Sequence, residues 1–281
     1  MQRERVSENV YWFQSDVYAQ VTAGVVVGPQ WALVIDTLAL PEETLAMRSF
    51  IEEHLNVPVR YIVNTHYHAD HTWGNCFFPG ATIISHTQCR KNMVDKGQDA
   101  LEQARKQSNS LKQVKLVLPH ITFSSGNMSL RVGKKNLILM PFPGHSDDAI
   151  SVLIEEDRVL FAGDVFMNLP YIVDGDLDNM RASIHSIAEM GLENIIQGHG
   201  DIILRGEIEE AIVENLRYLD CIEKAVRTAL KRDDPGEYLA EIDVEACGKS
   251  RVLLGGLAQD LHQRNLVSLY KKLAAQAAKA S

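Results

Sequence analysis

The first third of the chain has a pattern of apolar and polar positions that predicts strands separated by one helix. Residues 18–36 contain two β-branched runs separated by Gly28-Pro29, which is typical of a hairpin of buried strands. Residues 41–56 begin with a proline, carry acidic residues in the first turn and repeat apolar positions at helical spacing, so we expect a helix. Two further apolar runs predict short strands, at 59–66 and 81–86.

The middle of the chain combines a polar helical segment with a second set of strands. Residues 87–113 are charged and helical in character, so we expect them to cover the fold rather than to form its core. This segment and the loops are also where we expect substrate specificity to lie. A β-meander is predicted over 121–145, with turns at 125–127 and 133–135, and a hairpin over 149–166.

The last third is mainly helical. A helix is predicted over 180–191, where Gly191 ends it, and a strand from residue 194 that stops at His199. Helices follow from residue 207, with a break at 234–236. We therefore expect an α/β chain that forms a single domain over 1–281, in which residues 18–205 carry the functional motifs and 207–281 form a helical C-terminal part.

A cluster of histidines follows the strand predicted over 59–66. In the stretch NTHYHADHTWGN, three histidines and an aspartate fall within six positions: His66, His68, Asp70 and His71. If these groups were buried by chance, each would need its own hydrogen-bond partner. The cluster therefore favours a metal site over its alternatives, an exposed polar turn or a His-rich tract.

Three more polar residues also end predicted strands, namely His145, Asp164 and His199. Strand ends on one edge of a layered fold converge, so we expect all seven side chains in one cleft. Imidazole and carboxylate groups suit Zn²⁺, and also Fe²⁺ or Mn²⁺, better than Ca²⁺ or Mg²⁺. Seven ligands are too many for one tetrahedral ion and suit two ions that share a carboxylate.

These residues lie in motifs that resemble those of the metallo-β-lactamase-fold superfamily. The motifs occur in the family's order: LVIDT at 33–37, H-x-H-x-D-H at 66–71, PGHS at 143–146, AGD at 162–164 and GHG at 198–200. The resemblance implies a four-layer αββα sandwich, in which two mixed β-sheets pack face to face between flanking helices. It also implies a dinuclear metal site along one edge of the sheets.

The resemblance further implies a ligand set and a reaction. It assigns the first ion to His66, His68 and His145, the second to Asp70, His71 and His199, and the bridge to Asp164. The expected cofactor is two Zn²⁺, with Fe²⁺ or Mn²⁺ as alternatives. A bridging hydroxide would attack the carbonyl of an ester, a thioester or a lactone- or lactam-like substrate. Asp70 would be catalytic, because it could both bind the second ion and steer the hydroxide proton.

Three residues are candidates for supporting roles. We expect Asp36 to accept a hydrogen bond from a ligand imidazole and so fix its tautomer, with an ordinary turn carboxylate as the alternative. Trp73 and Tyr171 are candidates to line the substrate pocket, with packing as the alternative for both.

Several motif residues differ from those of particular groups in the superfamily, and these differences disfavour the activities of those groups. Asp164 stands where one class of zinc β-lactamases carries cysteine, and Met167 stands where quorum-quenching lactonases carry a tyrosine. His68 stands where flavodiiron-type members carry glutamate. The motifs look most similar to those of loosely defined β-lactamase-like hydrolases, including the quinoprotein-relay type.

Other activities on the same fold stay open. A mononuclear iron oxidoreductase resembling persulfide dioxygenases would contain iron and consume O₂, whereas the hydrolase would contain two zinc ions. A metal-dependent nuclease is disfavoured by the formal net charge of −9, because nucleic-acid binding needs clustered Lys and Arg. A non-catalytic scaffold would lack some of the ligands, and none is missing from the motifs.

Cysteine usage and hydropathy bear on the cellular environment. Cys76, Cys89, Cys221 and Cys247 form no C-x-x-C motif, so we expect reduced and mostly buried thiols. The first residues contain no signal-peptide h-region, and no apolar run is long enough to span a bilayer. We therefore expect a cytoplasmic protein that acts on a small molecule, away from membranes. The sequence does not indicate the substrate, the native metal or the oligomeric state.

Overall fold

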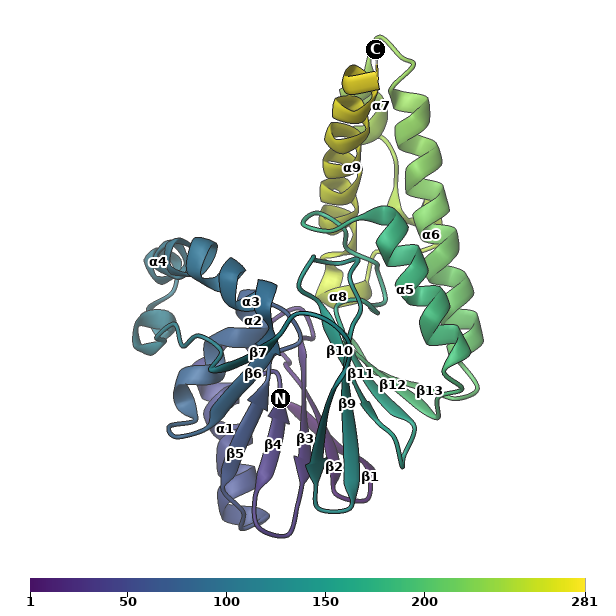
Figure 1. Ribbon diagram of the computed structural model, residues 1–281. Coiled ribbons are helices and arrows are strands. Elements are labelled where there is room, and N and C mark those ends of the chain that lie inside the picture. The colour runs from purple at the N-terminus through teal and green to yellow at the C-terminus, as the bar shows by residue number, and fades with distance from the viewer. Residues whose placement is uncertain (281) are drawn as a thin grey trace.

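Two mixed β-sheets face each other in the computed structural model, which describes residues 1–280 (Figure 1). The first sheet has the order β1-β2-β3-β4-β5-β6-β7, and its strands are parallel from β4 to β7. Its strands are β1 (Gln2–Ser7), β2 (Val10–Gln14), β3 (Thr22–Val27), β4 (Ala32–Ile35), β5 (Val59–Val63), β6 (Thr82–His86) and β7 (Ile121–Phe123).

The second sheet has the order β13-β12-β11-β10-β9-β8 and is antiparallel except between β11 and β12. Its strands are β8 (Met128–Val132), β9 (Lys135–Pro141), β10 (Ile150–Ile154), β11 (Val159–Gly163), β12 (Asn194–Gln197) and β13 (Ile202–Leu204).

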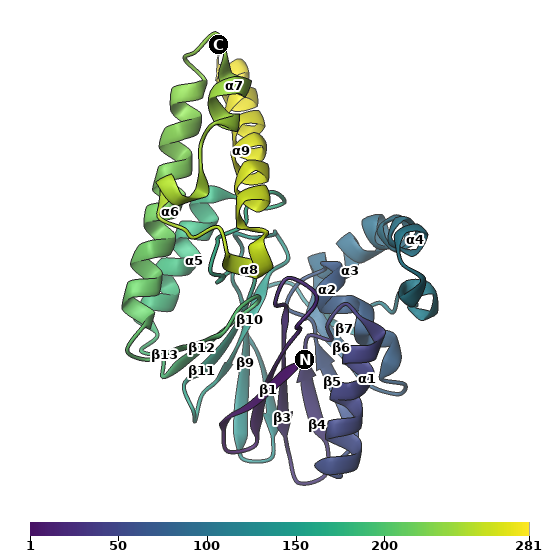
Figure 2. The same cartoon turned by 180° about the vertical axis from the view of Figure 1, so that it is seen from behind.

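Helices cover the outer faces of both sheets, and α6, α7 and α9 extend beyond the sheets (Figures 1 and 2). We call residues 208–280 the helical arm. The helices are α1 (Pro41–Ser49), α2 (Ala69–Thr72), α3 (Thr87–Asn92), α4 (Gln98–Gln107), α5 (Leu177–Glu189), α6 (Ile208–Ala229), α7 (Pro235–Ala240), α8 (Leu253–Gly256) and α9 (Ala258–Ala280). Single π-helical or 3₁₀ turns lie at Phe50–His54, Trp73–Phe77, Met93–Gly97, Asn109–Gln113 and Val244–Cys247.

Side chains that alternate between the two faces of each strand form the apolar cores between the layers of the fold. On β4, Leu33 and Ile35 point into the core between the two sheets, whereas Val34 points outward against Met47 of α1. Because both faces are buried, these strands read as nearly continuous apolar runs. A third core joins the outer face of the second sheet, including Leu160, to α5 and the helical arm. The expected αββα sandwich is confirmed.

The predicted meander over 121–145 is wrong in its first strand. Ile121 of β7 pairs with Ile84 in the first sheet, whereas β8 and β9 form a hairpin in the second sheet. The turn at 125–127 therefore carries the chain from one sheet to the other. Its sequence is the same kind of turn signal that joins neighbouring strands, so the local pattern does not distinguish the two cases.

The prediction of four reduced cysteines is wrong for one pair. Cys221 on α6 and Cys247 on the Val244–Cys247 turn form a disulfide, with Cα atoms 5.5 Å apart, while Cys76 and Cys89 are free. The two bonded residues are 26 positions apart in the sequence, and the packing of that turn against α6 brings them together. This is a tertiary contact that spacing in the sequence does not encode.

Removing this disulfide is expected to destabilise the protein. The double variant Cys221→Ser/Cys247→Ser opens a loop whose ends are 26 positions apart. The entropy gained by the unfolded chain should lower the free energy of unfolding by about 3.5 kcal/mol. Urea titrations with and without dithiothreitol measure the effect. The wild type and the variant should differ only without reductant; equal midpoints in both conditions would contradict the prediction.

Candidate metal centre

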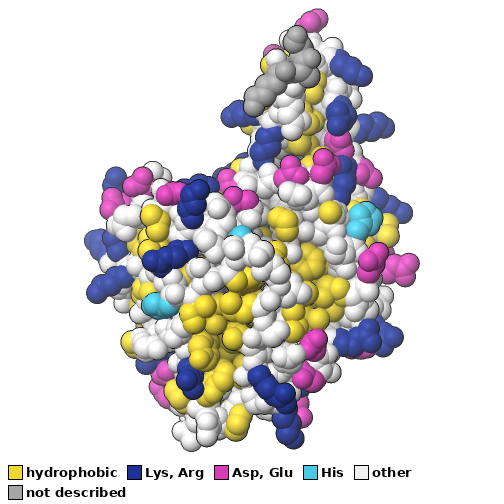
Figure 3. Space-filling view, in the orientation of Figure 1, with side chains coloured by type: hydrophobic (Ala, Val, Ile, Leu, Met, Phe, Trp, Pro, Cys, Tyr) yellow, Lys and Arg dark blue, Asp and Glu magenta, His cyan; other side chains and the backbone are white. Residues whose placement is uncertain are grey.

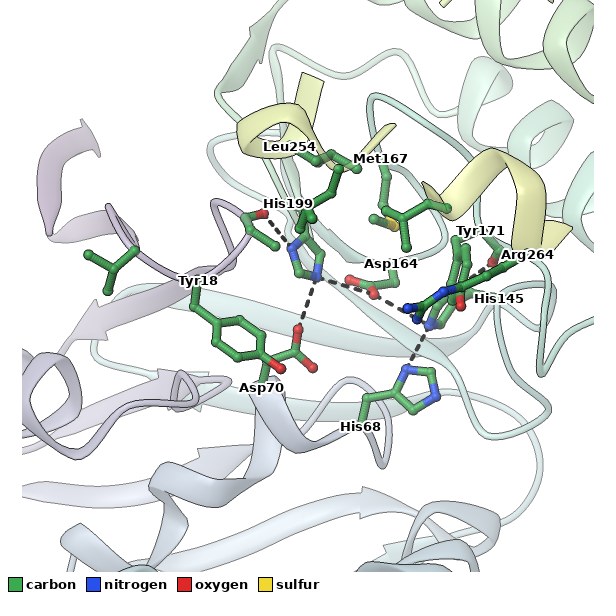
Figure 4. Close-up of a pocket in the computed structure, with 14 residues that line it drawn as sticks. Tyr18, His68, Asp70, His145, Asp164, Met167, Tyr171, His199, Leu254 and Arg264 are labelled. Atoms are coloured by element: carbon green, nitrogen blue, oxygen red, sulfur yellow. Dashed lines mark hydrogen bonds and ion pairs between the residues drawn. The ribbon is translucent and has the colours of Figure 1, made fainter. Parts of the chain in front are cut away.

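The seven predicted ligands lie together where strands of both sheets end. His66, His68, His145 and Asp164 form one group, and Asp70, His71 and His199 form a second. Within each group the potential ligand atoms all lie within 4.8 Å of one another. Asp164 touches both groups: its Oδ2 lies 3.3 Å from Nε2 of His145, and its Oδ1 lies 3.2 Å from Nε2 of His71. Figure 4 shows Asp164 between His145 and His199.

Local backbone geometry places the central carboxylate. Strand β11 ends at Gly163, whose φ of +56° lets the chain turn sharply before Asp164. Gly198, after β12, packs directly on this turn, and a Cβ atom at position 198 would lie 1.9 Å from Oδ1 of Asp164. The close approach of the two strand ends therefore requires glycine at position 198.

Each of four imidazoles is held through the nitrogen that faces away from the cluster. The pairs are His71 Nδ1 with Asp36 Oδ2 at 2.8 Å, His145 Nδ1 with the Tyr171 carbonyl at 2.7 Å, His199 Nδ1 with the Ala19 carbonyl at 2.8 Å, and His68 Nε2 with Asp174 Oδ2 at 3.1 Å. An acceptor on one ring nitrogen favours a proton there, so the other nitrogen, which faces the cluster, is the one available to a metal ion.

Asp36 also binds the backbone of the motif. Its two oxygens accept hydrogen bonds from the amide and the hydroxyl of Thr65, at 2.8 and 2.7 Å. The buried carboxylate, which follows β4, therefore links His71 to Thr65, the residue before His66.

Unpartnered buried atoms show that these residues fit metal ions. Nε2 of His66 is buried, has no hydrogen-bond partner in the described part of the chain, and lies 3.7 Å from Asp164. Oδ1 of Asp164 is buried and likewise forms no hydrogen bond there, although Nε2 of His71 lies 3.2 Å away. An unmet buried polar atom costs free energy, whereas a divalent cation would satisfy several such atoms at once. Donors of this kind suit zinc, iron or manganese.

The carboxylates of the site are anionic. Burial raises the pKa of Asp70, but His71 and His199 outweigh this effect and lower the pKa to about 2. For Asp164, burial is outweighed in the same way, chiefly by His199 and His71, which hold the pKa of Asp164 well below its usual range.

The imidazoles divide into two kinds. Burial lowers the pKa of His66, and lowers that of His145 to about 4, so both rings are neutral near pH 7. Burial opposes protonation of His71 and His199 too, but Asp164 is the main group that raises the pKa of each, to about 10 for His199. The second group therefore holds positive charge next to its carboxylates, and metal binding there would release protons.

A cavity of about 360 Å³ opens onto the cluster (Figure 4). His68, Asp70, His145, Asp164 and His199 line it. Its apolar walls include Met167 and, from the helical arm, Leu254, Leu257 and Leu261. Tyr18 and Tyr171 also line it. The negative charge of Asp70, and to a smaller extent burial, raises the pKa of Tyr18 to about 12. Arg264 of α9 reaches the same cavity and forms no ion pair within residues 1–280.

The sequence did not indicate most of these wall residues. Tyr171 lines the cavity, but Trp73 does not; its indole is buried beside Leu101 and Val114. The wall from the helical arm was missed because leucines at helical spacing equally fit a packed helix face. Leu254 has a φ of +56°, an unusual conformation for leucine, and a sequence pattern carries no signal of it.

Comparisons with known proteins agree with this geometry. A family model described as the metallo-beta-lactamase superfamily matches residues 18–207. The thioesterase pkgB of Emericella nidulans is 27% identical over 176 residues, which are 61% of this chain and 43% of that protein. The lactamase-like protein nscB of Trichophyton equinum is 27% identical over 243 residues, 83% of this chain and 65% of that protein. The chain thus spans less than two thirds of these curated relatives.

Solved structures share the fold at low sequence identity. A metallo-beta-lactamase from Pontibacter korlensis has a TM-score of 0.62 and 18% identity, covering 75% of this chain and 97% of that one. The sec-alkylsulfatase Pisa1 from a Pseudomonas species has a TM-score of 0.75 and 14% identity, covering 96% of this chain and 50% of that one.

Proposed function

Because the chain belongs to the metallo-beta-lactamase superfamily, we propose that it is a metal-dependent hydrolase of carbonyl substrates, with a thioester or an ester as the preferred class. The observation that carries the proposal is the pair of ligand groups that share Asp164 at the floor of an apolar cavity. The similarity to a protein named as a thioesterase favours thioesters within this class.

We propose that two divalent cations, with zinc as the first choice, bind the two groups and share Asp164. His66, His68 and His145 would hold the first, and Asp70, His71 and His199 the second. When bound, such ions lower the pKa of water toward neutrality and polarise a carbonyl. His68 would bind through Nδ1, because this nitrogen faces His145 while its Nε2 pairs with Asp174.

The residues of the chain would orient the substrate and move protons. Asp70 faces the cavity, with Oδ2 3.2 Å from Nε2 of His199, and we propose that this oxygen accepts the proton of the attacking water. Tyr18 keeps its proton at neutral pH and can donate a hydrogen bond to the substrate. The leucines of the arm exclude water, and the unpaired Arg264 would attract an anionic substituent.

A hydrolysis panel with metal analysis of the same samples tests this function. The panel contains an acyl thioester, the same thioester with a terminal carboxylate, a p-nitrophenyl ester, a lactone, a β-lactam and a phosphodiester. We expect thioester turnover, a lower KM for the carboxylate-bearing compound because of Arg264, and loss of turnover after chelation that zinc restores. Stoichiometric iron with O₂ uptake, or cleavage only of the phosphodiester, would contradict the proposal and favour one of the two alternative activities.

The partner and the compartment are further proposals. We propose a small-molecule substrate, because the cavity volume matches that of sites for small organic molecules. Lys and Arg are dispersed among Asp and Glu on the face shown in Figure 3, an arrangement that does not favour nucleic acid. Among the described helices, none combines the length and the hydropathy needed to cross a bilayer. A cytoplasmic location stays a prediction. One of its grounds was the expectation of four reduced cysteines, and the disulfide between Cys221 and Cys247 contradicts that expectation.

A further inference from the structure

A second hollow borders the candidate metal centre. Its volume is about 480 Å³, and it lies between residues 67–73 and a wall formed by Lys96, Gly97, Ala100 and Leu116. We call it the groove. His68 and Asp70 line both the groove and the Arg264 cavity, and among residues 1–280 no other residue lines both. These two side chains therefore form the boundary between the two spaces.

The groove has apolar walls and a rim whose charges compensate each other. Trp73, Leu116, Ala69 and Ala100 line it, and the first three belong to the apolar cluster beneath α4. At the rim, the Tyr67 hydroxyl donates to Oδ2 of Asp174 at 2.8 Å, and Nζ of Lys96 donates to the Tyr67 hydroxyl at 3.3 Å. The ammonium and the carboxylate thus lie on either side of one phenol, and the other carboxylate, that of Asp70, lies at the edge shared with the Arg264 cavity. The apolar walls away from this edge therefore favour an uncharged apolar group.

The Arg264 cavity is small for a substrate with a long substituent on each side of its carbonyl. An ester or a thioester carries a substituent on each side of its carbonyl, and that carbonyl must reach Asp70 and Asp164. The Arg264 cavity, at about 360 Å³, lies near the lower end of the range for small-molecule sites, about 300–1,000 Å³. It can hold one half of an elongated substrate, and the groove beyond His68 and Asp70 offers space for the other half.

We propose that the groove is a second substrate subsite, which binds an extended alkyl or acyl chain on the side of the reacting carbonyl opposite the Arg264 cavity. The proposal rests on the proposed function, because it places the carbonyl at the boundary residues. It assigns Trp73 a role in substrate binding through the groove, and it gives the helical segment around residues 96–100 a part in specificity.

Ligand binding tests the subsite without relying on turnover. The probes are S-dodecyl- and S-methyl-N-acetylcysteamine, which are thioethers and so contain no thioester bond for the protein to cleave. Each is titrated calorimetrically into the zinc-loaded protein. The wild type should bind the dodecyl probe at least about tenfold more tightly than the methyl probe, since a few buried methylene groups suffice for this preference. Ala100→Phe fills the groove and should reduce the preference to about threefold or less.

Two further variants make the test specific. Gln103→Phe adds the same ring to an exposed position of α4 outside the groove and should keep the wild-type preference. Ala100→Glu places a carboxylate among the apolar walls and should act like Ala100→Phe, which guards against a folding effect of the ring. If both variants at position 100 keep the full preference for the dodecyl probe, or if the wild type has no such preference, the alkyl chain of the probe does not bind in the groove. Failure of the proposed function would appear separately, as a wild type that hydrolyses no member of the panel.

Discussion

Asp164→Asn is expected to lose metal and activity together. The carboxylate lies within 3.7 Å of imidazole nitrogens from both ligand groups, so the substitution removes the one negative charge that both groups share. We expect the zinc content to fall from two ions to one or none per chain, and kcat/KM to fall by about a thousandfold or more, since metal ions stabilise such transition states by several kcal/mol. Elemental analysis and thioester hydrolysis of the same sample measure both effects.

A carboxylate far from the site supplies the control for this variant. Asp157 lies in the turn between β10 and β11 and pairs with Lys135 at 2.6 Å. Asp157→Asn should keep both ions and full turnover. If Asp164→Asn also kept two ions and wild-type turnover, the carboxylate would not be shared and the proposed dinuclear centre would be wrong.

Gly198→Ala is expected to have the second-largest effect, although it changes no ligand. The new Cβ atom would lie 1.9 Å from Oδ1 of Asp164 and 2.7 Å from the carbonyl carbon of Gly163. Neither the ligand nor the buried backbone can stay in place, so Asp164 must move out of the shared position. We expect zinc affinity and kcat/KM each to fall by about a hundredfold, as for ångström-scale misplacement of a catalytic group.

Gly206→Ala is the matched control, because a Cβ atom at that position meets no atom within 4 Å. Competition with a zinc chelator gives the affinities, and thermal unfolding shows whether either variant is destabilised. Equal zinc affinity of Gly198→Ala and Gly206→Ala would show that the site tolerates the displacement and would contradict the geometry described for Asp164.

The site was more predictable from the sequence than the cavity above it. The seven ligands are polar groups placed directly after apolar runs, and the ends of strands meet at one edge whatever the details of packing. The supporting contact of Asp36 with His71 follows from the same rule, since β4 lies next to β5. What these ligands bind stays a proposal, because the donor set suits several metals.

The parts that escaped prediction depend on how distant segments pack. Strand β1 has the sequence QRERVS and is mostly exposed at the edge of its sheet, so it shows no apolar alternation to detect. Leu254 and Arg264 reach the cavity only because the arm folds back over the strand ends. The bond between Cys221 and Cys247 depends on packing within the arm, between α6 and the turn at Val244–Cys247. A leucine or an arginine on an amphipathic helix looks the same whether it faces solvent, a neighbour or a substrate.

The wall that the helical arm contributes has a consequence for how activities diversify. The family model matches residues 18–207, whereas Leu254, Leu257, Leu261 and Arg264 all lie beyond that range. The candidate metal ligands and this wall of the cavity therefore lie in separate stretches of the sequence. Substitutions in the helical arm can change the shape of the cavity without altering the ligand motifs in residues 18–207. Homologues with identical ligand motifs can therefore differ in the substrates that they bind.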